Sequence, residues 1–302
     1  MKKCYRNSQY EIYHAESIEW LSSRRASSFH AVVTDPPFGL IEYSEREIRS
    51  RARGNGIWRL PNSRDGATRQ PTPRYTVLTV PDRSKLRGFV LRTSAELFRV
   101  LVPGAHVFWA THPLFSHIVC EAFADVGFEK RGEVIRTVIT LRGGDRPKGA
   151  HEEFRDVCVI PKACWEPWVL FRKPLRGRIQ DNLRRFGTGG LRMNSRPFRD
   201  LIHSKPATKA ERKIAPHPSL KPQQFMRQVV WAALPLGRGV IMDPFMGSGA
   251  TIAAAESLGL TSIGIEQSIR YFRMARKAIP ALAALEFPDD IKALNRNGKI
   301  TQ

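Results

Sequence analysis

Residues 35–38 read Asp-Pro-Pro-Phe and bring a carboxylate and an aromatic ring onto a stiffened turn. The apolar residues just before them, including Val32 and Val33, predict a buried strand that ends at Asp35, because proline cannot continue a central strand. A carboxylate held there is a preorganised hydrogen-bond acceptor, and the ring offers a face for stacking. Asp before Pro is also frequent in ordinary turns, so this stretch alone leaves a structural role open.

A second chemically suggestive stretch, residues 243–251 (DPFMGSGAT), follows an apolar strand and opens a helix. Glu266 ends the next predicted strand 23 residues after Asp243, a spacing typical of an acid that binds ribose hydroxyls. The loop is not G-x-G-x-x-G, and the acid before its glycines would repel a pyrophosphate, which disfavours NAD. The same acid suits an ammonium group, such as that on the methionine part of S-adenosylmethionine. A purely structural glycine turn is the alternative.

The segments that must position these residues alternate between strands and helices. Strands are predicted at residues 11–13, before Asp35, and at 103–111, 128–139, 165–173, 239–245 and 261–266. Helices are predicted around Ile18 and Leu21 and at residues 86–101, 114–123, 222–234, 252–259 and 269–279. This alternation predicts an α/β fold with a mostly parallel central sheet and helices on both faces.

The net charge of +21 indicates a polyanionic partner, nucleic acid first and an anionic membrane second. Most of the excess lies in two stretches rich in Gly, Pro, Ser and Asn, residues 44–74 with a net charge of +5 and residues 172–213 with +10. Neither shows a sustained helical or strand period, so we expect loop-rich basic inserts beside a neutral core. Solvated linkers are the alternative interpretation of each.

In the second stretch, Phe171, Phe186 and Phe198 are interleaved with arginines, a pattern that suits phosphate contact combined with base stacking. The residues that we expect to contact DNA are Arg184, Arg185, Phe186, Arg192, Arg196 and Arg199.

Four motifs together resemble the β-class amino-methyltransferases of DNA. They are residues 35–38, 217–225 (HPSLKPQQF), 243–251 and 264–266 (GIE). The catalytic motif comes first, the basic middle next and the cofactor loop last, which is the order that defines the β class. The resemblance spans about residues 10–284, and the two basic inserts match nothing in it.

The resemblance implies a Rossmann-like methyltransferase fold, circularly permuted so that the catalytic motif precedes the cofactor motif. It implies that residues 1–171 and 214–302 form one catalytic domain. Residues 44–76 would then be a basic mobile insert that closes over the substrate and orders on DNA, and residues 172–213 a basic target-recognition region.

The site residues implied by the resemblance fall into two sets. The catalytic set is Asp35, Pro36, Pro37 and Phe38. The set that binds S-adenosylmethionine is Asp243, Phe245, Gly247, Ser248, Gly249, Thr251, Glu266, Lys221 and Glu16. Two of these depart from the commoner family residues, since Glu16 stands where Asp is usual and Phe38 where Tyr is usual. A structural role as a helix start stays open for Lys221, and we interpret Glu166, with Trp165 and Trp168, as structural core.

The chemistry implied is methylation of an exocyclic amine on a nucleobase. Such an amine is a poor nucleophile because its lone pair is delocalised into the ring. Asp35 and the backbone carbonyl of Pro36 would accept its two N–H groups and free the lone pair, and Phe38 would stack on a base that has left the duplex. Attack on the sulfonium methyl is then an in-line displacement aided by proximity.

Asp at the head of the motif favours adenine N6 as the target, whereas Ser there is commoner for cytosine N4, which stays the close alternative. Methylation of RNA or of a protein glutamine is disfavoured, because those enzymes usually carry Asn there and place the cofactor loop first. A non-catalytic DNA-binding protein on a methyltransferase core is the alternative from another class.

The partners expected are double-stranded DNA, a second copy in a homodimer, and a cognate restriction endonuclease if the enzyme is not solitary. The four cysteines form no C-x-x-C pair, and His151 with Cys158 and Cys164 lacks zinc-ligand spacing, so no metal site is expected. No apolar run approaches the roughly 20 residues that span a bilayer, and the first residues lack the apolar stretch of a signal peptide. We therefore expect no membrane association and a cytoplasmic location in a bacterium, or as a phage or plasmid product.

Overall fold

The computed structural model describes residues 3–37, 79–138, 146–147, 149–193 and 195–287. Phe38 of the predicted catalytic set and all of the predicted insert at residues 44–76 lie outside these ranges. The expectations for both therefore stay predictions.

The described residues form one sheet in the order β1-β2-β9-β8-β3-β4-β6-β5-β7. The strands are β1 (Lys3–Arg6), β2 (Tyr10–His14), β3 (Phe29–Thr34), β4 (Leu101–Ala110), β5 (Glu129–Thr137), β6 (Trp165–Arg172), β7 (Leu201–His203), β8 (Val240–Asp243) and β9 (Thr261–Glu266). The block from β2 to β4 is parallel, β5 and β7 are also parallel, and β1 and β6 run antiparallel to their neighbours.

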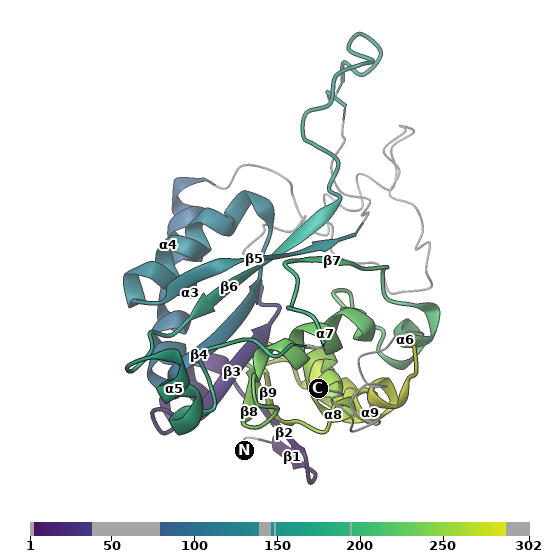
Figure 1. The fold of residues 1–302 in the computed structure, drawn as a ribbon. Coiled ribbons are helices and arrows are strands. Elements are labelled where there is room, and N and C mark those ends of the chain that lie inside the picture. The colour runs from purple at the N-terminus through teal and green to yellow at the C-terminus, as the bar shows by residue number, and fades with distance from the viewer. Residues whose placement is uncertain (1–2, 38–78, 139–145, 148, 194, 288–302) are drawn as a thin grey trace.

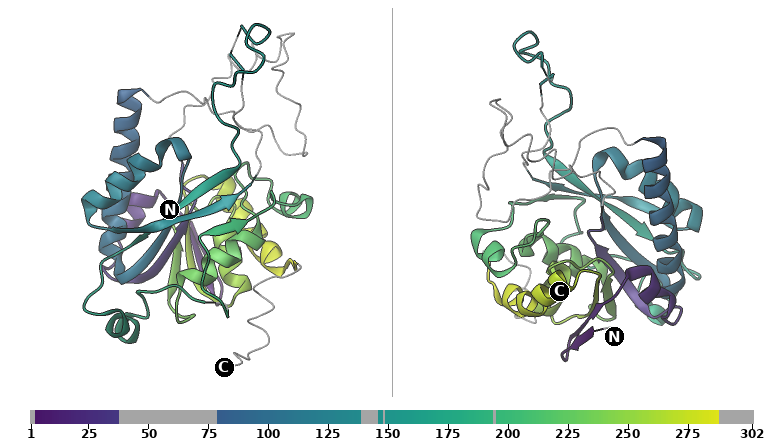
Figure 2. Two further views of the ribbon diagram at one scale, coloured as in Figure 1. Left: turned by 45° about the horizontal axis from the view of Figure 1, so that its top comes forward. Right: turned by 180° about the vertical axis from the view of Figure 1, so that it is seen from behind.

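Helices cover both faces of this sheet (Figures 1 and 2). They are α1 (Ser17–Ser22), α3 (Val80–Val100), the short 3₁₀ helix η1 (Pro113–Phe115), α4 (Ser116–Val126), α5 (Ile179–Phe186), α6 (Lys209–Ile214), α7 (Gln223–Ala233), α8 (Ala250–Ser257) and α9 (Ile269–Ala284). One buried apolar cluster joins α1, α3 and α4 to the sheet, and a second joins α7, α8 and α9 to the other face. The predicted α/β architecture with a mostly parallel sheet is confirmed.

Alternate residues of the central strands supply these two cores because successive side chains of a strand point to opposite faces. In β3, Val33 belongs to the cluster with α7, and Val32 belongs to the cluster with α3. Both are fully buried, as the sequence predicts. The strand that ends before Asp35 is therefore held from both sides.

The boundaries of α3 show a local signal that the hydrophobic period missed. Thr79 and Asp82 form a reciprocal capping box, so the helix begins at Val80 rather than near Leu86. At the other end, Val100 passes directly into β4. This long helix connects β3 to its parallel neighbour β4.

The basic stretch at residues 172–213 is less loop-rich than its composition predicts. It contains α5, α6 and β7, and β7 pairs with β5 as the edge strand of the sheet. These elements are short, which explains why no period was visible in the sequence. The expectation that Trp165 is core is also wrong, because its side chain is 40% exposed at the start of β6.

No helix within the described residues is long and apolar enough to cross a membrane. In the same ranges, no three His, Cys, Asp or Glu side chains lie close enough to hold a metal ion. The four cysteines are free thiols.

Candidate functional site

The two predicted motifs meet at the carboxyl edge of the parallel strands. β3 lies between β8 and β4, so the residues that follow β3 and β8 are neighbours although they are far apart in sequence. The Thr34 hydroxyl donates a hydrogen bond of 2.7 Å to Oδ1 of Asp243. Asp35, the next residue after Thr34, therefore stands beside the glycine loop.

Asp243 is buried beneath that loop. Its Oδ1 accepts from the Thr34 hydroxyl and from the backbone N–H of Phe245 at 3.0 Å. Burial raises its pKa to about 6, against the lowering by its hydrogen bonds with Thr251 and Thr34. In this structure the carboxylate holds the loop in place, and its predicted contact with a cofactor ammonium group stays a prediction.

Glu266 and the glycine loop form a second hydrogen-bonded unit at the same edge. The two carboxylate oxygens of Glu266 accept from the backbone N–H of Gly247 at 3.0 Å and of Ser268 at 2.6 Å. Gly247 has a φ of 52°, and a Cβ there would lie 3.1 Å from the ring of His217. The loop therefore needs glycine at this position because the 217–225 segment approaches it closely.

The remaining loop residues are mostly packed inward. Gly249 has a φ of 87°, and a Cβ there would lie 2.5 Å from Ile279 of α9, so this glycine serves packing. Ser248 and Thr251 are buried, and the Thr251 hydroxyl donates to the carbonyl of Val33 at 3.3 Å. These three residues fix the shape of the loop.

Aromatic rings from three elements meet beside the loop. Phe245 lies 5.6 Å from Phe89 of α3 and 6.1 Å from Trp109 of β4, between ring centroids. Trp109 is fully buried, whereas Phe245 is partly exposed. Of the predicted cofactor residues, Phe245 thus presents an open apolar face.

A network of charged side chains surrounds Asp35. Lys221 Nζ lies 3.0 Å from Asp35 Oδ2 and 3.2 Å from Glu166 Oε2. Glu166 Oε1 in turn lies 3.2 Å from Nη1 of Arg136 and accepts from the indole N–H of Trp168 at 2.9 Å. The cluster joins the ends of β3, β5 and β6 to the segment that precedes α7.

Burial and mutual attraction oppose each other in this cluster. Burial raises the pKa of Asp35, and the nearby Lys221 reduces that rise. Burial would also raise the pKa of Glu166, but Lys221 and Arg136 lower it to about 2. For Lys221, burial lowers the pKa, but the two carboxylates outweigh it and raise the pKa overall. Lys221 therefore favours the charged form of each carboxylate, and the two carboxylates favour the charged form of Lys221.

Glu166 and Arg136 are members of this site that our sequence interpretation missed, since it assigned Glu166 to the structural core. The available signal was weak, because Arg136 is one of several charged residues in β5 and Glu166 is one of two in β6. Lys221, for which a structural role was open, lies directly against Asp35. Pro36 is buried and Pro37 exposed in the same turn.

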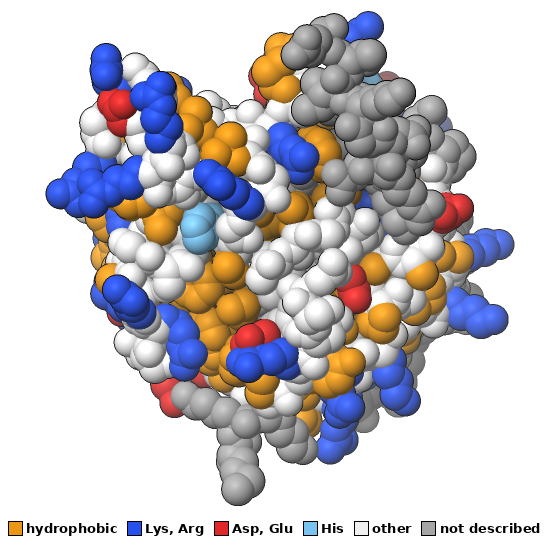
Figure 3. Space-filling view, turned by 60° about the horizontal axis from the view of Figure 1, so that its bottom comes forward, with side chains coloured by type: hydrophobic (Ala, Val, Ile, Leu, Met, Phe, Trp, Pro, Cys, Tyr) orange, Lys and Arg blue, Asp and Glu red, His pale blue; other side chains and the backbone are white. Residues whose placement is uncertain are grey.

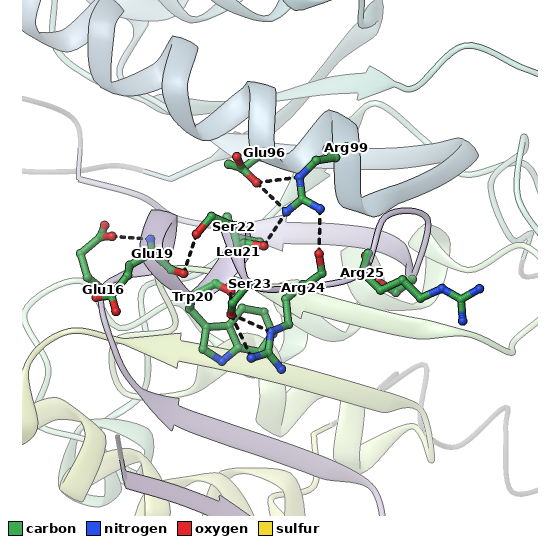
Figure 4. A network of polar contacts seen from close by, with 11 residues as sticks. Glu16, Glu19, Trp20, Leu21, Ser22, Ser23, Arg24, Arg25, Glu96 and Arg99 are labelled. Carbon is green, nitrogen blue, oxygen red and sulfur yellow. Dashed lines mark hydrogen bonds and ion pairs between the residues drawn. The ribbon is translucent and has the colours of Figure 1, made fainter. Parts of the chain in front are cut away.

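Glu16 lies at the start of α1, where its carboxylate accepts from the backbone N–H of Glu19 at 2.7 Å (Figure 4). Arg99 of α3 fastens the other end of this helix by donating to the carbonyls of Leu21 and Arg24. The carbonyl of Glu266 accepts from the N–H of Ala15, so Glu16 stands at the same edge as the loop. Its role in cofactor binding stays a prediction.

Two of the predicted DNA-binding arginines lie at the opposite end of the sheet. Asn182 of α5 donates to the carbonyl of Pro103, near the amino end of β4. The seven residue-to-residue steps from Pro103 to Ala110 span roughly 23 Å along an extended strand. Arg184 and Arg185 on α5 are exposed, but they lie about that far from the edge that carries Asp35.

The stacking on a base predicted for Phe171 is wrong. Phe171 is 1% exposed and its ring stacks on Phe123 at 4.0 Å, so it belongs to the core. Phe198 is partly exposed and packs edge-on against Phe108 of β4, and its contact with DNA stays a prediction. Phe186 is partly buried, with the Arg185 guanidinium 5.1 Å from its ring centroid, and its contact with DNA stays a prediction.

Arg192 is also used within the protein. Its guanidinium lies 3.4 Å from the centroid of the Trp231 ring, and burial lowers its pKa. Arg196 and Arg199 are exposed in the segment that leads to β7 and stay predictions. The predicted arginines therefore do not form one surface around Asp35.

A cavity of about 350 Å³ is also found away from Asp35. Its lining includes His106 of β4, Arg172 of β6 and Arg131 of β5, which lie toward the amino end of β4. Figure 3 shows the lower end of the molecule, where Lys and Arg side chains stand around an apolar strip. Positive charge is thus present at the end away from Asp35 and does not by itself identify the DNA surface.

Comparison with known proteins adds a family match. A family model described as DNA methylase, of the N6/N4 class, matches residues 29–277. The Type II methyltransferase M.HindIII from Haemophilus influenzae is 25% identical over an alignment of 298 positions. The alignment covers 87% of this chain and 93% of that protein.

Two solved structures share the fold at low sequence identity. The M1.HpyAVI complex with S-adenosylmethionine gives a TM-score of 0.52 at 16% identity and covers 89% of this chain and 99% of that one. The cytosine-N4-specific PvuII DNA methyltransferase gives a TM-score of 0.60 at 15% identity, covering 97% and 92%. At these identities the likeness establishes the fold alone.

Proposed function

Because the chain belongs to the N6/N4 family of DNA methylases, we propose that it methylates the N6 amine of a flipped-out adenine at a specific DNA site. S-adenosylmethionine is the cofactor of this family, and the resemblance seen in the sequence is confirmed. The observation that carries the proposal is the position of Asp35 beside the glycine loop and Glu266, at one edge of the sheet.

The residues at this edge fit S-adenosylmethionine. Glu266 is a partly buried carboxylate suited to ribose hydroxyls, and its hydrogen bond from Gly247 ties it to the loop. The positive φ and close packing of Gly247 leave no room for a side chain there. When bound, the cofactor supplies a methyl group on a sulfonium. We propose that Glu266, the loop and Phe245 hold it.

Asp35 is the acceptor that we assign to the target amine. Lys221 engages its Oδ2, whereas its Oδ1 is buried and accepts no hydrogen bond within the described part of the chain. With Oδ1 and the Pro36 carbonyl accepting the two amine N–H groups, the nitrogen lone pair is released for attack. The Asp35 carboxylate, whose pKa is raised by burial, then takes the proton that the methylated nitrogen loses.

The adenine must leave the duplex to reach this acceptor. The Asp35 side chain is only 18% exposed and lies at the end of a central strand, out of reach of a base stacked in B-form DNA. Extrusion of the base is therefore part of the proposal, as is stacking on Phe38, which lies outside the described residues.

Cytosine N4 is the second candidate target. Asp at the head of the motif favours adenine by the family resemblance, but the fold is shared with the cytosine-N4-specific PvuII enzyme. A non-catalytic DNA-binding protein is disfavoured, because Asp35 and Glu266 are both present and lie at one edge.

We further propose that residues 1–171 and 214–302 act as one catalytic domain and that residues 172–213 contribute to target recognition. As M.HindIII is a Type II methyltransferase, pairing with a cognate restriction endonuclease is proposed beside solitary action, together with a homodimer.

The test is to express the chain in a host that lacks DNA amino-methylation and to sequence its DNA with modified bases identified. N6-methyladenine at one recurrent sequence supports the proposal, and digestion to nucleosides with mass measurement checks the base. N4-methylcytosine would select the second candidate. Unmodified DNA, identical to that from a host expressing Asp35→Ala, would reject both.

A further inference from the structure

Asp35 does not stand alone at the carboxyl edge but is the end of a chain of ion pairs. The order of contacts is Asp35 to Lys221, Lys221 to Glu166, and Glu166 to Arg136. The Lys221 side chain is 11% exposed and that of Glu166 is 19% exposed, so water screens these contacts only weakly. The cluster therefore contains two carboxyl groups and two basic side chains.

We propose that Glu166 is a positioning residue for methyl transfer: by sharing the Lys221 ammonium with Asp35, it holds Asp35 Oδ2 in place and leaves Oδ1 free for the target amine. This inference rests on the proposed function, because it assigns the amine to Asp35. Glu166 itself does not touch the substrate in this account, and it acts through Lys221.

The geometry shows that Asp35 and Glu166 share the Lys221 ammonium, rather than Lys221 pairing with one of them. Lys221 Nζ lies at almost equal distances, 3.0 Å and 3.2 Å, from one oxygen of each carboxylate. The other oxygen of Glu166 is occupied by Arg136 and Trp168, which fixes the carboxylate on β6. The other oxygen of Asp35, in contrast, has no partner within the described ranges. The cluster is therefore fully paired except at the atom that the reaction needs.

Removal of the Glu166 charge would change the state of Asp35. The cluster would lose one negative charge and Lys221 would lose its second carboxylate, so the ammonium would no longer be fixed at Oδ2 and could also engage Oδ1. The pKa of Asp35 would fall, and its carboxylate would accept a proton less readily. Extra positive charge would also oppose the sulfonium of the cofactor.

A purely structural role is the competing explanation, and the molecule contains a matched control for it. Glu129 and Arg172 form a second carboxylate–arginine pair on the same two strands, at 2.6 Å. Both pairs are directly opposite in the β5–β6 ladder. The Glu129 pair contacts Gly189 rather than Lys221 and lies at the far end of the strands from Asp35. Glu129→Gln thus repeats the chemical change without the link to Asp35.

The pH dependence of the reaction separates the two explanations. Among the described residues, the charged groups around Asp35 are Lys221 from the segment before α7, Glu166 from β6, Arg136 from β5 and Asp243 from β8. His217 faces Lys221 and, because burial lowers its pKa to about 4, it is neutral where the assay is run. Loss of the Glu166 charge lowers the pKa of Asp35, so the acid limb of the kcat profile moves to lower pH.

The experiment compares Glu166→Gln, Glu166→Asp and Glu129→Gln in the full-length protein, with methyl transfer to DNA measured across pH. For Glu166→Gln we expect kcat to fall by about tenfold to a hundredfold, the scale of a small misplacement of a reacting group. Its acid limb should shift to lower pH by about one unit. Glu166→Asp should keep the wild-type acid limb and recover part of kcat, and Glu129→Gln should match the wild type in both.

A double-mutant cycle then tests whether Glu166 acts through Lys221. In a Lys221→Met background, Glu166→Gln should cause little further loss of kcat, because the shared ammonium is already absent. Additive losses would overturn the proposal, as would a Glu166→Gln enzyme with wild-type kcat and an unmoved acid limb. Titration of S-adenosylmethionine by calorimetry and thermal unfolding show whether each variant is folded. If Glu166→Gln does not fold, Glu166→Asp takes its place in the cycle: a loss of kcat that disappears in the Lys221→Met background supports the proposal, and one that persists there overturns it.

Failure of the inference can be told apart from failure of the proposed function. A wild-type protein that methylates DNA, with Glu166 variants that behave like Glu129→Gln, rejects the positioning role alone. A wild-type protein that transfers no methyl group to either adenine or cytosine rejects the proposed function.

Discussion

The two ends of the β5–β6 ladder carry the same chemical pair in different surroundings. At one end Arg136 faces Glu166, and at the other Arg172 faces Glu129. The first pair lies at the carboxyl edge of β3 and β8, where it meets Lys221 and, through it, Asp35. The second lies at the amino end of β4, where Arg172 donates to the carbonyl of Gly189.

The difference shows that the topology of the sheet, rather than the local sequence, gives a charged pair its role. Parallel strands bring all their carboxyl ends to one edge, and that edge collects Asp35, Asp243 and Glu266. β6 is antiparallel to β4, so the start of β6 reaches this edge and its end reaches the opposite one. The pair that meets Lys221 and the pair that meets Gly189 are thus separated by the length of one strand.

The largest expected difference in kcat is between removal of the carboxylate of Asp35, at the carboxyl edge, and removal of that of Glu129, at the opposite end of the sheet. Asp35→Ala removes the proposed acceptor and should lower kcat by about a thousandfold, the upper range for loss of a preorganised polar group. Affinity for S-adenosylmethionine should change little, since Glu266 and the loop are untouched. Glu129→Ala should leave kcat within about twofold, since surface changes far from a site have small effects. Steady-state kinetics and calorimetry check both, and equal losses of kcat would remove the distinction.

The next effect concerns the carboxylate that ties the loop to β9. Glu266→Ala deprives the N–H groups of Gly247 and Ser268 of their acceptor and removes the proposed ribose contact. We expect the Kd for S-adenosylmethionine to rise by about tenfold to a hundredfold, the equivalent of one to two hydrogen bonds to a charged group. Calorimetric titration gives this value without a DNA substrate. An unchanged Kd would show that the carboxylate serves only the loop.

A smaller effect is expected in the pH dependence of stability. Burial raises the pKa of Asp243 to about 6 from 3.8, so the folded protein binds a proton more tightly than the unfolded chain. The free energy of unfolding therefore falls as the pH rises between these values and is constant above them. Asp243→Asn has no titrating group at this position, so its free energy of unfolding does not fall in this way as the pH rises. The amide keeps an oxygen that can accept from Thr34 and Phe245.

Relative to the wild type, Asp243→Asn should gain about 2 kcal/mol of stability between about pH 4.5 and about pH 7.5. Urea unfolding of both proteins at the two pH values gives the difference. The other carboxyl groups titrate in both proteins, so their contributions to the free energy of unfolding largely cancel in the difference. A difference that is the same at both pH values would contradict the assigned pKa.

The sequence predicted the part of the site that depends on local signals. A strand that stops at prolines and a strand that opens into glycines each mark a carboxyl end, and a parallel sheet brings such ends together. Asp35, Asp243 and Glu266 were identified in this way. The fold and the family also followed, because the motif order is informative by itself.

The pairing of Lys221 with Glu166 could not be predicted from the same signals. It depends on β6 lying between β4 and β5 in an antiparallel sense, and no periodicity encodes that order. The three residues of β7 are too few to show a period, so the chain from α5 to α6 was interpreted as loops. Arginines in such a segment reveal its charge but not which end of the sheet they reach.

The smallest expected effect tests which end of the sheet contacts DNA. The basic helix α6 lies toward the carboxyl edge of the parallel strands, and the basic helix α5 lies at the opposite end. α6 lies next to Lys221, because Oε1 of Glu211 accepts from the N–H of Gln223 at 2.6 Å. Its Lys209 and Lys213 are exposed, and we expect them to lie nearer than α5 to the edge where DNA presents a base. Arg184 and Arg185 on α5 carry the same charge at the opposite end.

Lys209→Gln with Lys213→Gln should weaken DNA binding by about tenfold and reduce the slope of log Kd against log salt by about 1 to 2, as expected for two lost phosphate contacts. Arg184→Gln with Arg185→Gln removes the same charge and should change both quantities much less. Fluorescence anisotropy with a labelled duplex at several salt concentrations measures them. If the α5 pair has the larger effect, DNA reaches the amino end of β4, and the sequence prediction for these arginines is the better guide.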